Sequence, residues 1–318
     1  MKIKYLLLFL FTIQLADSWA QVKPSSFTII PLGVKGGLDE SDLSAYLVSA
    51  KGNNQFICLD AGTINHGLQK AVANHLLKAT NAQKAQQDFI KAYFISHAHL
   101  DHTAGLILNS PNDNAKNIYG FESVLDVLKN NYFTWKSWAN FGNEGDKPIL
   151  NKYNYSLLSP NKEVEINNTD LRVKPFLLSH VNPYESSAFL INNKGQYLLY
   201  LGDTGADTVE KSNQLETLWR SIAPLIQQGV LHGIMIEVSF SNQVPEKSLF
   251  GHLTPSLLMS ELTKLNSLSG NRLRNTPILV THIKPCDTCE NQIKKEIADA
   301  NTLVLKIIYP VQGQKIEL

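Results

Sequence analysis

Four potential metal ligands fall within six consecutive positions of the sequence, and no other feature restricts the fold as strongly. They are the side chains of His97, His99, Asp101 and His102 in "HAHLDH", directly behind the apolar run "KAYFIS". Burying so many polar groups is costly unless they are paired, so the segment is either a solvated loop or a metal site. On an extended loop the first two histidines can point to one side, while Asp101 and His102, past a bend, point to another. One ion cannot easily be bound by both pairs, which predicts two metal ions.

The rest of the chain alternates between strand-like and helix-like stretches. Short apolar runs predict strands near residues 27, 45, 55, 91, 172, 196, 233 and 277. Helix-like stretches lie between several of them, at 66–79, 121–130, 213–228 and 255–268. This alternation predicts an α/β protein whose sheets are covered by helices. No linker, repeat or low-complexity tract divides the chain after residue 20, so we expect one domain over residues 21–318.

Ligand-type side chains follow five of the predicted strands. Each has an ordinary alternative, because aspartates beside glycine are common in turns and single histidines are more often hydrogen-bonded or exposed than metal-bound. In layered α/β proteins, however, ligands gather at the carboxyl ends of strands, where the loops converge on one edge of a sheet. The repeated placement therefore favours a shared site formed by Asp60, His97, His180, Asp203 and His282.

These motifs resemble a known superfamily. H-x-H-x-D-H after a strand is similar to the hallmark of the metallo-β-lactamase fold, which implies a four-layer αββα sandwich of two facing sheets with helices outside. Within that superfamily, "HAHLDHTAGLILNSP" at 97–111 resembles the signature of the class II cyclic-nucleotide phosphodiesterases. "IEVSFSN" at 236–242, "FGHLTP" at 250–255 and "THIKP" at 281–285 are also similar to that family.

The resemblance assigns a role to each candidate ligand. It implies one ion held by His97, His99 and His180, and a second held by Asp101, His102 and His282. It also implies that Asp203 bridges the two ions, that Asp101 takes part in catalysis, and that Asp60 orients ligands without binding metal. Imidazole and carboxylate ligands suit zinc and also admit manganese or iron.

A further histidine resembles the general acid of phosphodiesterases with this fold. His252 in "GHLTP" is preceded by Glu237 in "IEVSF", and we expect Glu237 to raise the pKa of His252 by stabilising its charged form. The alternative is structural: His252 would lie at a helix N-terminus and Glu237 at a solvated strand end. In either case Thr254 is expected as an N-cap, with Pro255 at the first helical position.

The reaction implied is hydrolysis of 3′,5′-cyclic AMP or GMP to the 5′-monophosphate. A hydroxide bridging the two ions would attack phosphorus, and His252 would protonate the departing 3′ oxygen. Alternatives are another hydrolase of this fold, such as a different phosphodiesterase, a lactamase or a thioesterase, or a non-catalytic protein that binds metal or cyclic nucleotides. The aromatic residues between 131 and 142 are candidates for purine stacking, although such residues more often pack a helix onto the core.

The N-terminus predicts export. Lys2 and Lys4 precede an apolar run at 5–15, and small residues end the segment, as in a signal peptide cleaved after Ala20. An uncleaved anchor is the alternative, but the apolar run is short for a membrane span. We therefore expect a secreted or periplasmic protein with no stable membrane insertion, for which a homodimer is one assembly to consider.

The charge balance argues against one class of partner, and the three cysteines have separate expected roles. Of 29 basic and 28 acidic residues, the first twenty positions hold two and one, which leaves 27 of each and argues against nucleic acid as a partner. Cys58 lies in an apolar run and is expected to be a small buried side chain. Cys286 and Cys289 form a C-x-x-C that either closes a disulfide in an oxidising compartment or stays reduced.

Overall fold

The computed structural model describes residues 26–318. The predicted signal peptide and its cleavage site at Ala20 lie outside these residues. Among the residues that the structure describes, no helix has both the length and the apolar character needed to cross a membrane.

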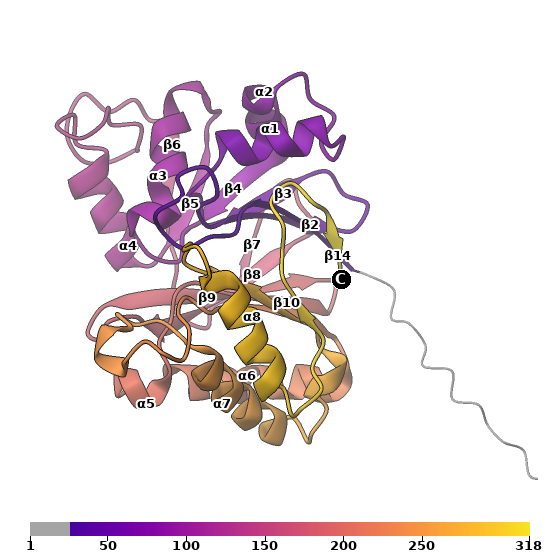
Figure 1. The fold of residues 1–318 in the computed structure, drawn as a ribbon. Coiled ribbons are helices and arrows are strands. Elements are labelled where there is room, and N and C mark those ends of the chain that lie inside the picture. Colours follow the sequence, from indigo (N-terminus) through magenta and orange to yellow (C-terminus); the bar gives the residue numbers. More distant parts are fainter. Residues whose placement is uncertain (1–25) are drawn as a thin grey trace, which may run out of the picture.

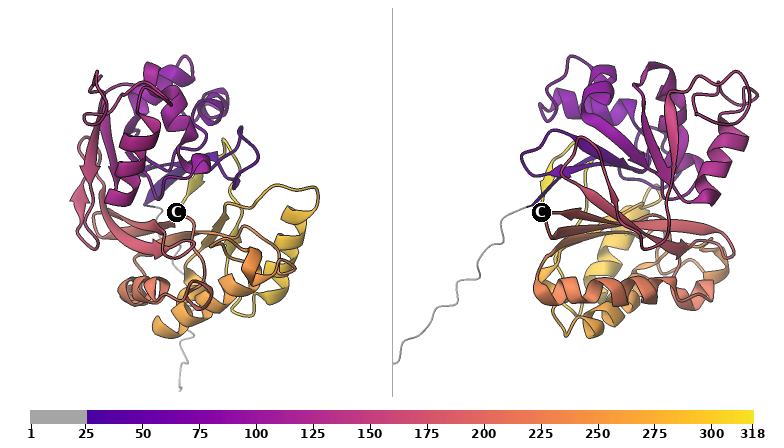
Figure 2. Two further views of the ribbon diagram at one scale, coloured as in Figure 1. Left: turned by 90° about the vertical axis from the view of Figure 1, so that its left-hand side faces the viewer. Right: turned by 180° about the vertical axis from the view of Figure 1, so that it is seen from behind.

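Two seven-stranded sheets face each other (Figures 1 and 2). The first has the order β14-β1-β2-β3-β4-β5-β6, and the second has the order β13-β12-β11-β10-β9-β8-β7. The strands of the first sheet are β1 (Phe27–Gly33), β2 (Ala45–Ala50), β3 (Phe56–Leu59), β4 (Ile90–Phe94), β5 (Lys116–Gly120), β6 (Tyr153–Leu157) and β14 (Ile316–Glu317). Those of the second are β7 (Val164–Glu165), β8 (Arg172–Ser179), β9 (Glu185–Asn193), β10 (Gln196–Leu201), β11 (Leu231–Glu237), β12 (Ile278–Thr281) and β13 (Ile307–Ile308).

Helices cover the outer face of each sheet (Figure 1). On the first sheet these are α1 (Asn65–Ala73), α2 (Ala82–Phe89), α3 (Leu100–Asn109) and α4 (Glu122–Val127). On the second they are α5 (Asp207–Glu210), α6 (Gln214–Gln228), α7 (Pro255–Leu268) and α8 (Cys289–Ala300). Short helical turns are η1 (Ser110–Asn112), η2 (Leu128–Tyr132), η3 (Glu246–Ser248) and η4 (Leu273–Asn275).

Three hydrophobic cores hold these layers together. The middle core lies between the sheets, where the ring of Phe94 on β4 meets that of Phe189 on β9 edge-on, with 5.4 Å between their centroids. One outer core packs the first sheet against its helices through residues such as Leu68 of α1. The other packs the second sheet against α6 and α7, with the fully buried Trp219 and Leu262. Helix, sheet, sheet and helix therefore form the four-layer sandwich that the sequence predicts.

Most predicted elements are present, with shifted ends. The helix predicted at 255–268 is α7, but the one predicted at 66–79 is too long, because α1 ends at Ala73 and His75 takes a positive φ of 57°. The stretch predicted at 121–130 is α4 followed by a π-helical turn. Helix α3 begins at Leu100, so the bend in the histidine motif is a helix start. The strand of residues 90–94 thus leads through His97 and His99 directly into a helix.

Parallel pairing collects strand ends at one edge of the sandwich. Strands β3 to β6 are parallel to one another in the first sheet, and β10 to β13 are parallel to one another in the second. The register sets Glu237 on β11 opposite Thr281 on β12. Glu237 and His282, the residue after Thr281, therefore lie side by side at the end of the second sheet. In the first sheet Leu59 is opposite Phe94, which places Asp60 beside the start of the histidine motif.

Candidate metal and active site

The seven predicted metal ligands converge at this edge in two groups. Within each group the ligand atoms lie within 4.8 Å of one another. The first group is His97, His99 and His180, and the second is Asp101, His102, Asp203 and His282. The groups adjoin at Asp203, whose Oδ2 lies 3.7 Å from His97 Nε2 and 3.3 Å from His102 Nε2. These two groups contain the residues that the motif assigns to two ions, and Asp203 lies between them. His252 also lies within reach of both, in a third group with His180 and Asp203 and a fourth with Glu237 and His282.

The closest ring nitrogens of the second group point toward each other. His102 Nε2 lies 3.1 Å from His282 Nε2, while the Nδ1 atoms of the two rings contact Asp60 and Ser239. Because both Nδ1 atoms already have partners, the two Nε2 atoms are the ring nitrogens left to bind a ligand between them. Nitrogens bound at 2.0–2.1 Å to one zinc ion lie about 3.3 Å apart in a tetrahedron. The arrangement therefore fits a divalent cation.

Burial keeps the first group in the state that binds metal. It lowers the pKa of His97, His99 and His180, and for His97 and His99 the neighbouring histidines lower it further. Neutral imidazoles carry the lone pair that coordinates a metal. Burial would raise the pKa of Asp203, but the charges of His282 and His102 outweigh it and hold the carboxyl ionised.

Asp60 is hydrogen-bonded to side chains that belong to or contact both ligand groups. Its carboxylate accepts hydrogen bonds from Ser96 N at 2.7 Å, Ser96 Oγ at 2.7 Å, His102 Nδ1 at 2.8 Å and Tyr200 Oη at 2.5 Å. Ser96 Oγ also lies 3.1 Å from His97 Nδ1, so one carboxylate is connected to a ligand in each group. Asp60 belongs to neither ligand group and is placed to orient their imidazoles.

His180 is oriented by a backbone carbonyl. Its Nδ1 donates to Gly251 O at 2.8 Å. Gly251 has a φ of 73°, and a Cβ there would lie 2.7 Å from His180 Nδ1 and 2.4 Å from Val181 N. Only glycine fits this position without a shift of the loop. The turn after His180 is held in addition by the buried Glu210, which accepts from Ser179 Oγ and Asn182 N.

Glu237 and His252 are hydrogen-bonded beside the two groups. Glu237 Oε1 lies 2.8 Å from His252 Nδ1, and the two residues are 1% and 5% exposed, so Glu237 is not a solvated strand end. The ring of His252 lies 5.0 Å from that of His180 and 5.3 Å from that of His282, next to both groups. Thr254 caps α7 as predicted, accepting from Leu257 N, with Pro255 first in the helix. The cap and the buried pair therefore coexist.

The predicted direction of the His252 pKa is wrong. Burial lowers this pKa to about 4; Asp203 opposes the shift and Lys284 adds to it. Burial, with a smaller contribution from the charge of Asp203, raises the pKa of Glu237 to about 7. Burial penalises both charged forms more than the contact between them compensates. The pair therefore favours a protonated carboxyl beside a neutral imidazole.

Several supporting residues carry no local sequence signal. Ser239 Oγ donates to Glu237 Oε2 at 2.8 Å and lies 2.9 Å from His282 Nδ1, which links the acid pair to a ligand. Tyr200 reaches Asp60 from the opposite sheet. Ser96 and Ser239 follow strand ends, as the ligands do, and this placement is the one signal that could have indicated them.

The aromatic segment at 131–142 belongs mainly to the core. Phe133 and Phe141 are buried among the residues that pack α3 and α4 on the first sheet. Tyr132 Oη donates to Ala98 O at 2.9 Å, between His97 and His99 in the motif. This segment therefore supports the backbone of the histidine motif.

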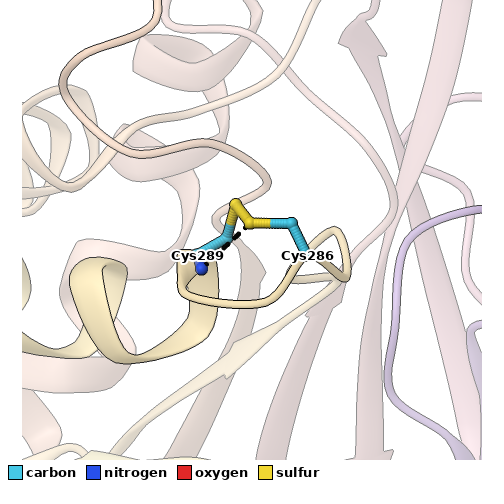
Figure 3. The surroundings of a disulfide bond; sticks show 2 residues. All are labelled: Cys286 and Cys289. Carbon is cyan, nitrogen blue, oxygen red and sulfur yellow. Dashed lines mark hydrogen bonds between the residues drawn. A yellow bond between two sulfur atoms is a disulfide. The ribbon is translucent and has the colours of Figure 1, made fainter.

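The structure confirms the prediction for Cys58 and has the disulfide among the two alternatives left open for Cys286 and Cys289. Cys58 is buried with a free thiol. Cys286, in the loop after His282, forms a disulfide with Cys289, the first residue of α8, with 5.3 Å between their Cα atoms (Figure 3). Neither of them belongs to a ligand group.

Sequence comparisons converge on one family. Residues 25–308 match the family described as cAMP phosphodiesterases class-II. A 3′,5′-cyclic-nucleotide phosphodiesterase of Aliivibrio fischeri is 40% identical, with 92% of this chain and 93% of the relative covered. A probable 3′,5′-cyclic-nucleotide phosphodiesterase of Yersinia pestis is 36% identical, with 93% and 90% covered.

Solved structures support the fold. Unliganded yeast PDE1 superposes with a TM-score of 0.81 at 22% identity, over 93% of this chain and all of that one. A metallo-β-lactamase fold protein of Bacillus subtilis gives a TM-score of 0.60 at 16% identity, over 92% of this chain and all of that one.

Proposed function

The chain belongs to the class II cAMP phosphodiesterases, and from this membership we propose that it hydrolyses 3′,5′-cyclic nucleotides to nucleoside 5′-monophosphates with two divalent ions. The names of the relatives support the substrate class. The observation that carries the proposal is the pair of ligand groups joined at Asp203, with a buried Glu237–His252 pair beside them.

The seven ligands define what the ions contribute. We assign His97, His99 and His180 to one ion, Asp101, His102 and His282 to the other, and Asp203 to both. Two divalent ions in such sites supply a hydroxide nucleophile near neutral pH and neutralise charge on the phosphoryl group. Zinc is the proposed metal, because the set consists of imidazoles and carboxylates around compact sites. Manganese and iron suit the same ligands.

His252 and Glu237 supply the proton for the leaving 3′ oxygen. His252 Nδ1 faces Glu237 Oε1, which leaves Nε2 to donate. A neutral imidazole is a weak acid unless its second nitrogen gains a proton at the same time. Because the pKa of Glu237 is raised to about 7, its carboxyl can pass a proton to Nδ1 while Nε2 releases one. Glu237 thereby acts on the substrate through His252.

Export is a separate proposal based on residues 1–20. We propose that residues 21–318 form the mature domain, which is secreted or periplasmic and has no nucleic-acid partner; a homodimer is the assembly to test. The disulfide of Cys286 and Cys289 suits an oxidising compartment. Recovery of the protein from the periplasm with Gln21 as its first residue would agree, and recovery from the cytoplasm with Met1 retained would not.

The substrate class is tested by comparing esters on purified residues 21–318. We expect release of 5′-AMP and 5′-GMP from the 3′,5′-cyclic nucleotides and no turnover of a β-lactam or an acyl thioester. Turnover of one of those esters without cyclic-nucleotide hydrolysis would keep the fold and overturn the substrate. Binding of cyclic nucleotide without turnover would indicate a non-catalytic protein, which has no use for a buried proton donor.

A further inference from the structure

Lys284 places a positive charge at the rim of the site. It follows His282 by two residues, and its backbone N–H donates to Ser239 O at 3.3 Å. Its half-buried side chain sets Nζ 5.7 Å from the centre of the Phe240 ring, within cation–π distance. The same ring contacts His252 edge-on, with 5.7 Å between centroids. Ammonium, phenyl ring and acid pair therefore lie in succession.

The ammonium also lies near a predicted metal ligand. A Cβ on Gly37 would be 3.8 Å from Lys284 Nζ and 3.8 Å from Asp101 Oδ2. That carboxylate oxygen is 3.2 Å from His282 Nε2, within the second ligand group. Gly37 has a φ of 58° and carries no side chain, so the space that the ammonium and Asp101 share is not filled from this loop.

Lys284 differs from the neighbouring Lys35 in having no anionic partner. No carboxylate oxygen of residues 26–318 lies within ion-pair distance of Lys284 Nζ, whereas Lys35 Nζ lies 2.5 Å from Glu290. Residues 35 and 283 form a parallel bridge, so the two lysines come from adjacent segments. A partly buried ammonium has three donors to satisfy, and an anion is its best partner.

We propose that Lys284 binds a non-bridging phosphate oxygen of the cyclic nucleotide and of its 5′-monophosphate product. This proposal rests on the proposed function. The two ligand groups and His252 approach the phosphate from the metal and leaving-group directions, and Lys284 provides a cation from the side of Phe240. A phosphomonoester carries more negative charge than a phosphodiester near neutral pH. Product binding should therefore depend on Lys284 at least as strongly as substrate binding.

Three variants test the proposal: Lys284→Gln, Lys284→Arg and the control Lys35→Gln. Loss of a charge-assisted hydrogen bond should raise the KM for 3′,5′-cAMP about tenfold or more, and the inhibition constant of 5′-AMP by at least as much. In Lys284→Arg both constants should lie closer to the wild-type values, because arginine keeps the positive charge. Lys35→Gln removes the same charge nearby but should change neither constant, since Glu290 keeps Lys294 at 2.6 Å.

Metal content and thermal unfolding identify a variant that fails to fold. In a folded Lys284→Gln protein, a KM and a 5′-AMP inhibition constant within twofold of wild type would overturn the assignment. If that variant does not fold, the Arg variant decides, because affinity as weak as expected for Gln would contradict a role of the charge. Wild-type protein inactive on cyclic nucleotides would contradict the proposed function alone. Calorimetric binding of 5′-AMP would still test Lys284, and equal affinities of wild type and Lys284→Gln would overturn it.

Discussion

Asp60 Oδ2 lies 2.8 Å from His102 Nδ1, and both side chains are fully buried. This contact sets the tautomer of the imidazole. A carboxylate accepts only, so Nδ1 keeps its proton and Nε2 is the nitrogen left to bind a metal ion in the second ligand group. The hydrogen bonds of Asp60 to Ser96 extend the same control toward His97.

Asp60→Asn should therefore weaken metal binding without removing a ligand. The new amide can donate to His102 Nδ1, which moves the ring proton to Nε2 and blocks the lone pair. We expect a 10- to 100-fold loss of metal affinity, measured by competition with a chromophoric chelator. Asp207→Asn is the control, because this buried carboxylate accepts from the start of α6 and touches no ligand. Equal metal affinities in wild type and Asp60→Asn would contradict the orienting role.

Replacing the acid pair should separate turnover from metal content. His252→Ala and Glu237→Gln are expected to lower kcat for cAMP by about 10²- to 10⁴-fold, the usual contribution of general acid catalysis. Metal content, measured by elemental analysis, should stay at the wild-type value. The exposed His66 provides the control, since His66→Ala should leave kcat unchanged. Loss of metal from His252→Ala would show that this residue is a ligand and not the acid.

The raised pKa of Glu237 predicts a pH effect on the stability of metal-free protein. Burial lifts this pKa from 4.5 to about 7, so between these values the folded state holds a proton that the unfolded state has lost. Glu237 therefore contributes stability at low pH that is lost as pH rises through the folded pKa. His252, whose pKa falls to about 4, has the opposite effect between pH 4 and 6.5.

Replacing Glu237 with Gln should remove its contribution to the pH dependence of the free energy of unfolding. In urea unfolding at pH 5, 6 and 7, the free energy of unfolding of Glu237→Gln should improve relative to wild type as pH rises. The limit is about 1.4 kcal/mol per pH unit for one proton. A constant difference across this range would contradict the raised pKa.

Alanine substitutions at Gly251 and Gly270 distinguish a clash with His180 of the first ligand group from the general cost of a positive φ. Both have a positive φ, but a Cβ at Gly251 would collide with His180 Nδ1, whereas nothing lies within 4 Å at Gly270. Gly270→Ala should cost about 1 kcal/mol of stability from backbone strain and leave metal binding intact. Gly251→Ala should also displace His180 and release one of two ions. Two full equivalents of metal in Gly251→Ala would show that this clash is relieved without moving the ligand.

The convergence of the seven residues in the two ligand groups was predictable from sequence, because each follows a strand end or lies in the compact histidine motif. Their supports were harder to predict, since Tyr200 reaches Asp60 across the middle core from another sheet and Gly251 contacts His180 from a distant loop. The direction of the His252 pKa shift was predicted wrongly because it also depends on residues from distant parts of the chain. Its direction depends on how many side chains exclude water from the pair, which no local pattern records.

Reconstitution of metal-free protein with zinc tests the central claim most directly. The rate of 5′-AMP release from 3′,5′-cAMP would be followed as metal is added, with bound metal counted by elemental analysis. Two ligand groups joined at Asp203 predict activity that reaches its maximum at two bound ions per chain and is abolished by a chelator. Full activity at one ion per chain, or activity that survives complete removal of metal, would contradict the two-ion phosphodiesterase.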